Sequence, residues 1–282
     1  MRAHDNRRPV VAGYDGSKAS ERALRWGVDE ARLRFVPLIV CHAWQWPYPM
    51  PAISAESMEA VRHMGRHVLD TGVSLARALA PRLEVRSRLE TGSASVVLMG
   101  ESSAAELVVV GQRGAGGFEE LQIGSTAFQL ASHTHSPVVV VKQHFRPRTG
   151  LVVVGVDGAN PERPELGLAF EEAQLRQASL RAICMCPEDT ADSREISARF
   201  YRTIAVWEEK HPQVTVETVV QLGSHMATLQ RVADGADVTV IGDRTPEDPV
   251  ELPLGLVCQA LLRGAPGTVV VVPSRAPGPS SR

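Results

Sequence analysis

The sequence repeats one pattern along its length, and this repeat constrains the fold more than any other feature. Three pairs of similar segments carry it: PVVAGYDGS at 9–17 with LVVVGVDGA at 151–159, AELVVVGQRG at 105–114 with ADVTVIGDRT at 236–245, and SPVVVVK at 136–142 with GTVVVVP at 267–273. Each half presents these segments in the same order. The 282 residues therefore fit two similar domains in tandem, which agrees with the usual size of a domain.

The spacing between the copies locates the domain boundaries. The offset is 142 residues between Asp15 and Asp157 but 131 between Gly111 and Gly242, so the second copy has lost eleven residues in its middle. The polar segment QHFRPRTG connects the halves and is broken by proline and glycine. We predict a first domain at 1–145, a second at 151–275 and a disordered tail at 276–282.

Short, valine-rich runs alternate with helical patterns in each half. The predicted strands of the first half are 10–14, 37–43, 83–90, 106–111 and 136–142, and the predicted helices follow Ser17, span 54–80 and 93–104, and begin near Ser125. Strands that are covered by helices on both faces have this apolar composition. The alternation predicts an α/β fold in which each domain is a doubly wound, Rossmann-like parallel sheet.

Two loops of the first half carry the residues that suggest a ligand. Ligands of open α/β sheets bind at the carboxyl ends of the strands, where the strand order reverses. We expect Asp15, after the first strand, to face the loop that starts at Gly111. Glycines at 111, 114, 116 and 117 permit positive φ and close approach of the backbone. Gly124 and Ser125 then open a helix, whose first N–H groups suit a phosphate.

With its repeated halves and the motifs of its first copy, the chain resembles a universal stress protein of the tandem two-domain type. Gly111, Gly114, Gly124 and Ser125 meet the pattern G-x2-G-x9-G-[S/T], and Asp-Gly-Ser follows the first strand. The resemblance implies five parallel strands in each domain and ATP, with Mg²⁺, at the switch point. The residues it places at the nucleotide are Gly13, Asp15, Ala43, Gly111, Arg113, Gly114, Gly124, Ser125 and Thr126.

Their implied roles differ. Gly13 and Asp15 would lie by the ribose and phosphates, and Asp15 would accept from ribose hydroxyls or hold Mg²⁺. The backbone of Ala43 would meet the adenine. The glycine loop, Ser125 and Thr126 would hold the phosphates. Arg113 either adds positive charge there or is a solvated loop side chain.

The second copy departs from the pattern. Asp157, Gly242 and Gly255 remain, but Thr245 replaces the second glycine and Leu256 replaces the serine. Its loop, DRTPEDPVELPL, adds carboxylates, which repel phosphate, and prolines, which lack an N–H donor. We therefore predict that the first domain binds ATP and that the second is a degenerate partner.

Three functions remain open at this point. The first is a nucleotide-dependent stress-response or signalling module, and the second is a slow Mg²⁺-dependent ATP hydrolase or phosphoryl-transfer enzyme. Against the enzyme, the loop has no lysine and no candidate base is visible, so at most a weak ATPase is expected. The third is a structural adaptor without nucleotide. A P-loop signature and a GxSxG nucleophile motif are both absent from the sequence.

Composition and charge limit the partners. The net charge of −2 gives no basic field for nucleic acid, and no apolar run is long enough to span a membrane, so we expect a cytoplasmic protein. The resemblance implies that the two domains pair through their last strands, 136–142 and 267–273. A homodimer and an unidentified signalling partner are expected in addition.

Cysteines and histidines offer weaker indications. We predict that Cys41, Cys184, Cys186 and Cys258 are buried and reduced. Cys184 and Cys186 lie on one face of a predicted strand, which leaves a copper site as an alternative to simple packing. His63 and His67 have a metal-binding spacing, but no third ligand is apparent, so a solvated helix face is expected.

Overall fold

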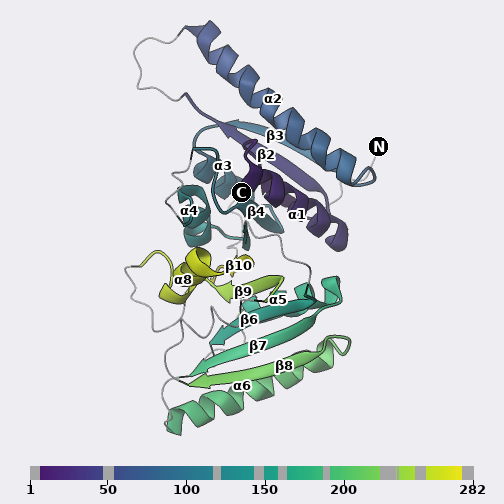
Figure 1. Ribbon diagram of the computed structural model, residues 1–282, viewed down its shortest axis with the longest axis vertical. Coiled ribbons are helices and arrows are strands. Elements are labelled where there is room, and N and C mark those ends of the chain that lie inside the picture. Colours follow the sequence, from purple (N-terminus) through teal and green to yellow (C-terminus); the bar gives the residue numbers. More distant parts are fainter. Residues whose placement is uncertain are drawn as a thin grey trace, which may run out of the picture. The chain divides into compact units, whose positions relative to one another are not determined.

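A computed structural model divides the chain into two compact units, 1–141 and 142–282 (Figure 1). The structure describes residues 7–46, 54–116, 122–142, 149–157, 164–186, 191–222, 233, 235–244 and 252–274. The predicted tail at 276–282 lies outside these ranges.

The first unit contains five parallel strands in the order β3-β2-β1-β4-β5. The strands are β1 (Val10–Gly13), β2 (Leu38–Trp44), β3 (Val85–Thr91), β4 (Leu107–Gly111) and β5 (Val138–Val141), and the helices are α1 (Lys18–Arg34), α2 (Ala55–Leu79), α3 (Ala94–Ser102) and α4 (Ser125–His133). This confirms the predicted doubly wound α/β fold. Observed and predicted ends of these elements differ by one or two residues in most cases.

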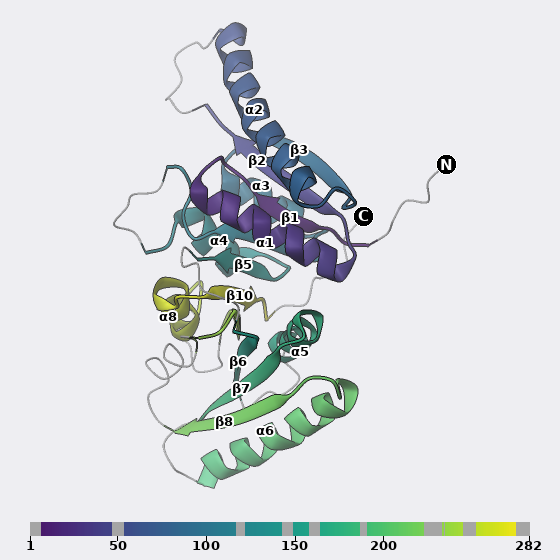
Figure 2. The ribbon, with the colours of Figure 1, turned by 45° about the vertical axis from the view of Figure 1, so that its right-hand side comes forward.

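Two pairs of helices cover the sheet of this unit. Helix α1 contacts α2, and α3 contacts α4; the two pairs lie on opposite faces of the sheet (Figure 2). Right-handed crossovers produce this arrangement because the strand order runs one way from β1 to β3 and then restarts on the other side of β1. The order reverses between β1 and β4, which are hydrogen-bonded neighbours. The carboxyl ends of these two strands therefore form the crevice where a ligand is expected.

The second unit repeats the topology. Its strands are parallel in the order β10-β9-β6-β7-β8. They are β6 (Leu151–Asp157), β7 (Ser179–Cys186), β8 (Val216–Leu222), β9 (Val238–Gly242) and β10 (Thr268–Val272), with helices α5 (Pro164–Arg176), α6 (Ala191–Lys210) and α8 (Leu256–Gly264). Gly155 pairs with Ile183 as Gly13 pairs with Cys41, so the offset of 142 residues holds across both strand pairs.

The end of the first helix is the same in both units. Glu30 is fully buried in an ion pair with Arg34, and buried Glu172 pairs with Arg176 in the second unit. The residue that follows each arginine has a positive φ, 56° at Phe35 and 52° at Gln177, and thus ends the helix in the left-handed conformation.

Glycine allows helix α2 to approach the sheet, and its replacement should destabilise the fold. A Cβ on Gly72 would lie 2.6 to 3.0 Å from ring atoms of the buried Tyr14. We expect Gly72→Ala to lower the free energy of unfolding by about 1–3 kcal/mol, since overpacking has that cost. Chemical denaturation measures the change.

The matched control is Gly100→Ala in helix α3, where a Cβ would meet nothing within 4 Å. Alanine should stabilise that helix by about 0.5–1 kcal/mol relative to glycine. Equal unfolding free energies for the two variants would show that Tyr14 does not restrict helix α2.

Candidate functional site

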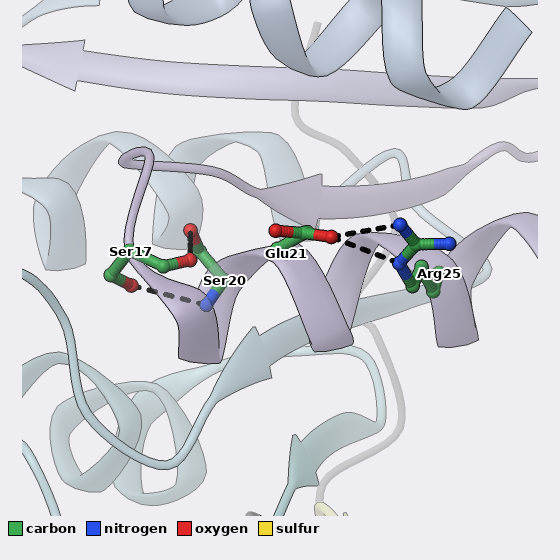
Figure 3. Close-up of polar contacts among 4 residues, drawn as sticks. All are labelled: Ser17, Ser20, Glu21 and Arg25. Carbon is green, nitrogen blue, oxygen red and sulfur yellow. Dashed lines mark hydrogen bonds and ion pairs between the residues drawn. The ribbon is translucent and has the colours of Figure 1, made fainter. Parts of the chain in front are cut away.

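The loop between β1 and α1 is ordered by its own polar groups. The Ser17 hydroxyl caps helix α1 by accepting the Ser20 N–H at 3.1 Å, and the Ser20 hydroxyl donates to the Ser17 carbonyl at 2.9 Å (Figure 3). The helix that was predicted to follow Ser17 is thus confirmed, with Ser17 as its N-cap. Glu21, in the first turn of α1, and Arg25, one turn further on, form an exposed ion pair at 2.8 Å (Figure 3). Gly16 has φ 80°, a turn conformation that favours glycine.

Asp15 joins the two loops that the sequence predicts to face each other. One carboxylate oxygen accepts the Ser17 N–H at 3.0 Å, and the other accepts the Ala115 N–H at 2.7 Å, 100 residues further along the chain. Burial alone would raise the pKa of Asp15, but hydrogen bonds from Ser17, Ala115 and Ser20 outweigh it, so the pKa lies below its ordinary value. The carboxylate is therefore ionised at neutral pH and fixes the start of the glycine loop.

The glycine loop begins and ends at one backbone hydrogen bond. The Gly124 N–H donates to the Gln112 carbonyl at 2.8 Å, and the Gln112 N–H donates to Val141 at the end of β5 at 3.0 Å. Gly124 is the N-cap of helix α4 and has no side chain with which to cap it. The first N–H groups of α4, which begins with Ser125 and Thr126, have no intrahelical acceptors and carry a partial positive charge. This end of the helix is chemically suited to an anion.

The loop glycines permit a positive φ, but Gly111, Gly114 and Gly116 do not have one. Other atoms do approach the loop glycines closely, but at Gly111 and Gly114 those atoms belong to the protein itself. A Cβ on Gly111 would lie 2.7 to 2.9 Å from atoms of Ala19 in the first turn of α1. Gly111 is thus required because α1 begins directly against the end of β4. Gly117 lies outside the described residues.

The next two glycines of the loop differ from each other. A Cβ on Gly114 would lie 2.6 Å from the Asp15 carboxylate, so this glycine makes room for Asp15. A Cβ on Gly116 would meet nothing within 4 Å. Among these loop glycines, Gly116 is therefore a position where added bulk can report on a bound ligand.

The remaining predicted residues lie around this centre. Gly13 ends β1, and a Cβ there would lie 2.9 Å from the Leu98 side chain, so it would point at core atoms. Ala43 lies in β2 and pairs with Glu90 of β3. Arg113 is close to Gly124, since a Cβ on that glycine would lie 3.4 Å from the arginine Cα. The contacts thus bring Asp15, Gly114 and Gly124 together, whereas Gly13 and Ala43 contact neighbouring strands.

Sequence reasoning missed one contact beside Ala43. The His42 ring lies with Nδ1 2.7 Å from the Tyr14 carbonyl. Because a carbonyl only accepts, Nδ1 carries the proton. Helix α2 passes close to both rings, at Gly65 beside His42 and at Gly72 beside Tyr14. The seven-residue spacing of these glycines on a long helix was the available sequence signal.

The second unit keeps the base of the loop but changes its side chains. The Gly255 N–H donates to the Asp243 carbonyl at 2.8 Å, and the Asp243 N–H donates to Val272 at 2.9 Å, as in the first unit. The Asp243 carboxylate accepts from the Ser274 N–H at 3.0 Å. Leu256, in the position of Ser125, is 49% exposed at the start of α8.

Several predicted features of this unit cannot be placed. Thr245, Glu247, Asp248 and Glu251 lie outside the described residues, and only the backbone of Asp157 is described. Within the ranges that the structure covers, no three His, Cys, Asp or Glu side chains gather as a metal site. None of the helices described there is long and apolar enough to cross a bilayer.

Fold and site together define a doubly wound α/β protein in which a Rossmann-like domain occurs twice. The sequence profile of the Universal stress protein family matches residues 6–142 and again 150–273. The chain belongs to the universal stress protein family.

Known proteins of this family resemble the chain over most of its length. Universal stress protein Rv2028c of Mycobacterium tuberculosis is 28% identical over 93% of this chain and 95% of the relative. A universal stress protein structure from Archaeoglobus fulgidus has a TM-score of 0.72 at 17% identity and covers 94% of this chain and 96% of its own. A further universal stress protein, solved in complex with cAMP, is 25% identical over 48% of this chain and 96% of its own, with a TM-score of 0.38.

Proposed function

We propose that the first domain binds ATP and that the protein acts as a nucleotide-dependent regulator or signalling module of the stress response. The observation that carries the proposal is the bridge from Asp15 to the Ala115 N–H, at 2.7 Å. This bridge holds a glycine loop beside the start of helix α4, whose N-cap is Gly124, at the switch point between β1 and β4. Such a crevice combines backbone donors for phosphates with an acceptor for hydroxyl groups.

The residues have distinct proposed roles. The N–H groups of Gly114, Gly124, Ser125 and Thr126 bind the phosphates, and Arg113 adds positive charge. Gly111 sets the direction in which the loop leaves β4. These assignments place the anion at the end of the helix that carries the positive partial charge.

The nucleoside has a second set of proposed contacts. Asp15 accepts from the ribose hydroxyls or holds Mg²⁺, the backbone of Ala43 meets the adenine, and Gly13 lies beside the ribose. A carboxylate has about four acceptor positions. Each oxygen of Asp15 accepts one backbone N–H here, and the Ser17 and Ser20 hydroxyls also act on this carboxylate, so a ligand hydroxyl or Mg²⁺ would take the place of these hydroxyls. Mg²⁺ commonly takes one carboxylate together with phosphate oxygens, which this donor set fits.

The second domain lacks these phosphate-binding residues and, in this proposal, binds no ATP. Leu256 places an apolar side chain at the start of α8, and the Asp243 carboxylate stands at the base of the loop. Both oppose an anion, although the loop base keeps the geometry of the first domain. Pairing of the domains through their last strands, a homodimer, an unidentified signalling partner and a cytoplasmic location remain predictions from the sequence.

Copurified nucleotide tests the proposal directly. The protein is purified without added nucleotide, denatured, and the released small molecules are identified by mass; we expect ATP at up to one molecule per chain. Incubation with Mg-ATP should then leave the nucleotide intact. Two molecules per chain would contradict the degenerate second domain, and steady release of ADP would favour the alternative of a slow hydrolase. No binding at millimolar ATP would leave the adaptor role instead.

A further inference from the structure

Strand β3 forms one edge of the sheet in the first unit (Figure 2). Its neighbour among the strands that the structure describes is β2 alone, and the described range 54–116 runs through β3 without a gap. An edge strand presents a row of backbone N–H and C=O groups with which another strand can pair. The chemistry of this edge therefore determines what can bind there.

Hydrogen bonds at both ends of β3 show which backbone groups point away from β2. The Leu38 N–H donates to the Glu84 carbonyl, and the Gly92 N–H donates to the Trp44 carbonyl, both at 2.9 Å. Backbone groups of successive residues point to opposite sides of a strand, so the even-numbered residues between these two bonds also face β2. The groups that point outward belong to Val85, Ser87, Leu89 and Thr91.

Three charged side chains of β3 share one face of the sheet. They are Arg86, Arg88 and Glu90, which occupy alternate positions and are exposed. Arg88 forms an ion pair with Glu101 of α3 at 3.3 Å, so this is the face that α3 covers. Leu89 lies on the opposite face, where α2 packs, and is half-buried.

The order of these charges distinguishes the ways in which two copies of β3 can pair. Two copies related by a twofold axis pair antiparallel, and three registers match at least five strand residues, centred on Ser87, Arg88 or Leu89. The charged residues then form the non-hydrogen-bonded pairs, in which side chains lie closest. Opposite charges stabilise such pairs and like charges destabilise them.

The register centred on Leu89 has attractive pairs alone. It sets Arg88 of each copy opposite Glu90 of the other. Centring on Ser87 would set Arg86 opposite Arg88 twice, and centring on Arg88 would set that arginine opposite itself. A guanidinium has five N–H donors, so Arg88 can keep Glu101 and bind a second carboxylate.

We propose that two copies of this chain associate through β3, antiparallel, with the twofold axis at Leu89. Each hydrogen-bonded pair of such a ladder exchanges two backbone bonds, here at Leu89 with itself and at Ser87 with Thr91. Edge strands that stay single carry charges that repel a second copy. The charges on β3 instead complement a second copy in this register, and the sheets of two first domains become continuous.

Charge reversal tests the register on the full-length protein by sedimentation equilibrium. Arg88→Glu and Glu90→Arg should each weaken self-association by about 10- to 100-fold, because two attractive pairs become repulsive. An equimolar mixture of the two variants should restore the dimer. In the mixture, carboxylates at positions 88 and 90 of one copy face guanidinium groups at the same positions of the other.

The second unit supplies the matched control. Leu180 pairs with Val216 of β8 as Leu38 pairs with Val85 of β3, so β8 is the corresponding strand. Glu217, beside Val216, forms an ion pair with Arg181 at 2.7 Å. Glu217→Arg is a charge reversal of the same kind on this strand and should leave the dissociation constant of the dimer unchanged.

A proline variant tests the ladder without changing a charge. The Ser87 N–H points away from β2, so Ser87→Pro keeps the bonds between β2 and β3 but removes a donor from the dimer. It should sediment as a monomer, whereas Ser87→Ala should remain a dimer. Circular dichroism checks that each variant is folded. The test remains available if a charge variant does not fold, and it is independent of ATP binding.

Several outcomes would overturn the proposal. A protein that is monomeric at every concentration has no such interface. Dimers that persist in Ser87→Pro and in both charge variants use another surface. A dimer that survives Arg88→Glu but not Glu90→Arg would place the twofold axis at Arg88. Variants that stay monomeric when they are mixed would show that Arg88 and Glu90 do not face each other.

Discussion

Replacement of Asp15 by alanine should weaken ATP binding by about 10- to 150-fold. Hydrogen bonds to charged groups contribute about 1.5–3 kcal/mol each, and the variant leaves the Ala115 N–H without its carboxylate. The loop then loses its tie to the end of β1, and the ligand loses an acceptor. Calorimetric titration of the purified protein with Mg-ATP measures the change.

Asp157→Ala is the matched control for this prediction, because Asp157 occupies the equivalent position of the second domain. It should leave both the affinity and the stoichiometry unchanged. Equal loss of binding in the two variants would mean that both domains hold nucleotide. Asp15→Asn refines the result, since an amide keeps the shape of the side chain but cannot accept at both atoms.

The pH dependence has a defined sign. The folded-state pKa of Asp15 lies below the ordinary value of 3.8. A depressed carboxyl pKa adds stability that is present above the unfolded value and is lost as the pH falls through the folded value. Asp15 should therefore stay ionised between about pH 5 and 8, so its titration should not change the ATP affinity in that range. Its contribution to the stability of the fold should be lost only in stronger acid.

Gly111→Ala should be the most damaging of the loop substitutions for stability. The new Cβ would lie 2.7 Å from the backbone carbon of Ala19 and 2.8 Å from its oxygen, so α1 must move away from β4. Backbone atoms in the first turn of a buried helix shift less readily than a flexible side chain. We expect a loss of about 3 kcal/mol, the upper end of the usual range for overpacking, in chemical denaturation.

Gly116→Ala separates packing from binding. Its Cβ would meet nothing within 4 Å in the protein, so the unfolding free energy should change by less than about 0.5 kcal/mol. If phosphates occupy the loop, the same substitution should weaken ATP binding. A stable variant with unchanged ATP affinity would place the nucleotide away from this part of the loop.

Much of the fold could be predicted from the sequence because its signals are local and repeated. Valine-rich runs such as Val138–Val141 are buried on both faces of the sheet, and Ser17 caps its helix by a contact three residues away. The duplicated motifs fixed the domain pattern, since each half independently indicates the same order of elements. The observed positions of Asp15 and Gly124 at the crevice follow from that order.

The contacts that the sequence could not supply are those between distant residues. Nothing near Asp15 in sequence indicates that its partner is the N–H of Ala115. The neighbours of Gly111 were hidden for the same reason, because the atoms closest to its missing Cβ belong to Ala19. The buried pair of Glu30 and Arg34 looks like an ordinary surface pair until the fold covers it.

The hydrogen bond that closes each loop at its base has an evolutionary consequence. The segments 112–124 and 243–255 are equally long, and each leaves and rejoins the sheet through the same backbone contact at 2.8 Å. This contact joins backbone atoms, so it does not depend on which side chains lie between its two ends. Mutations can thus remodel one half's chemistry while its scaffold stays intact, so a duplicated gene can acquire a new ligand without an unstable intermediate.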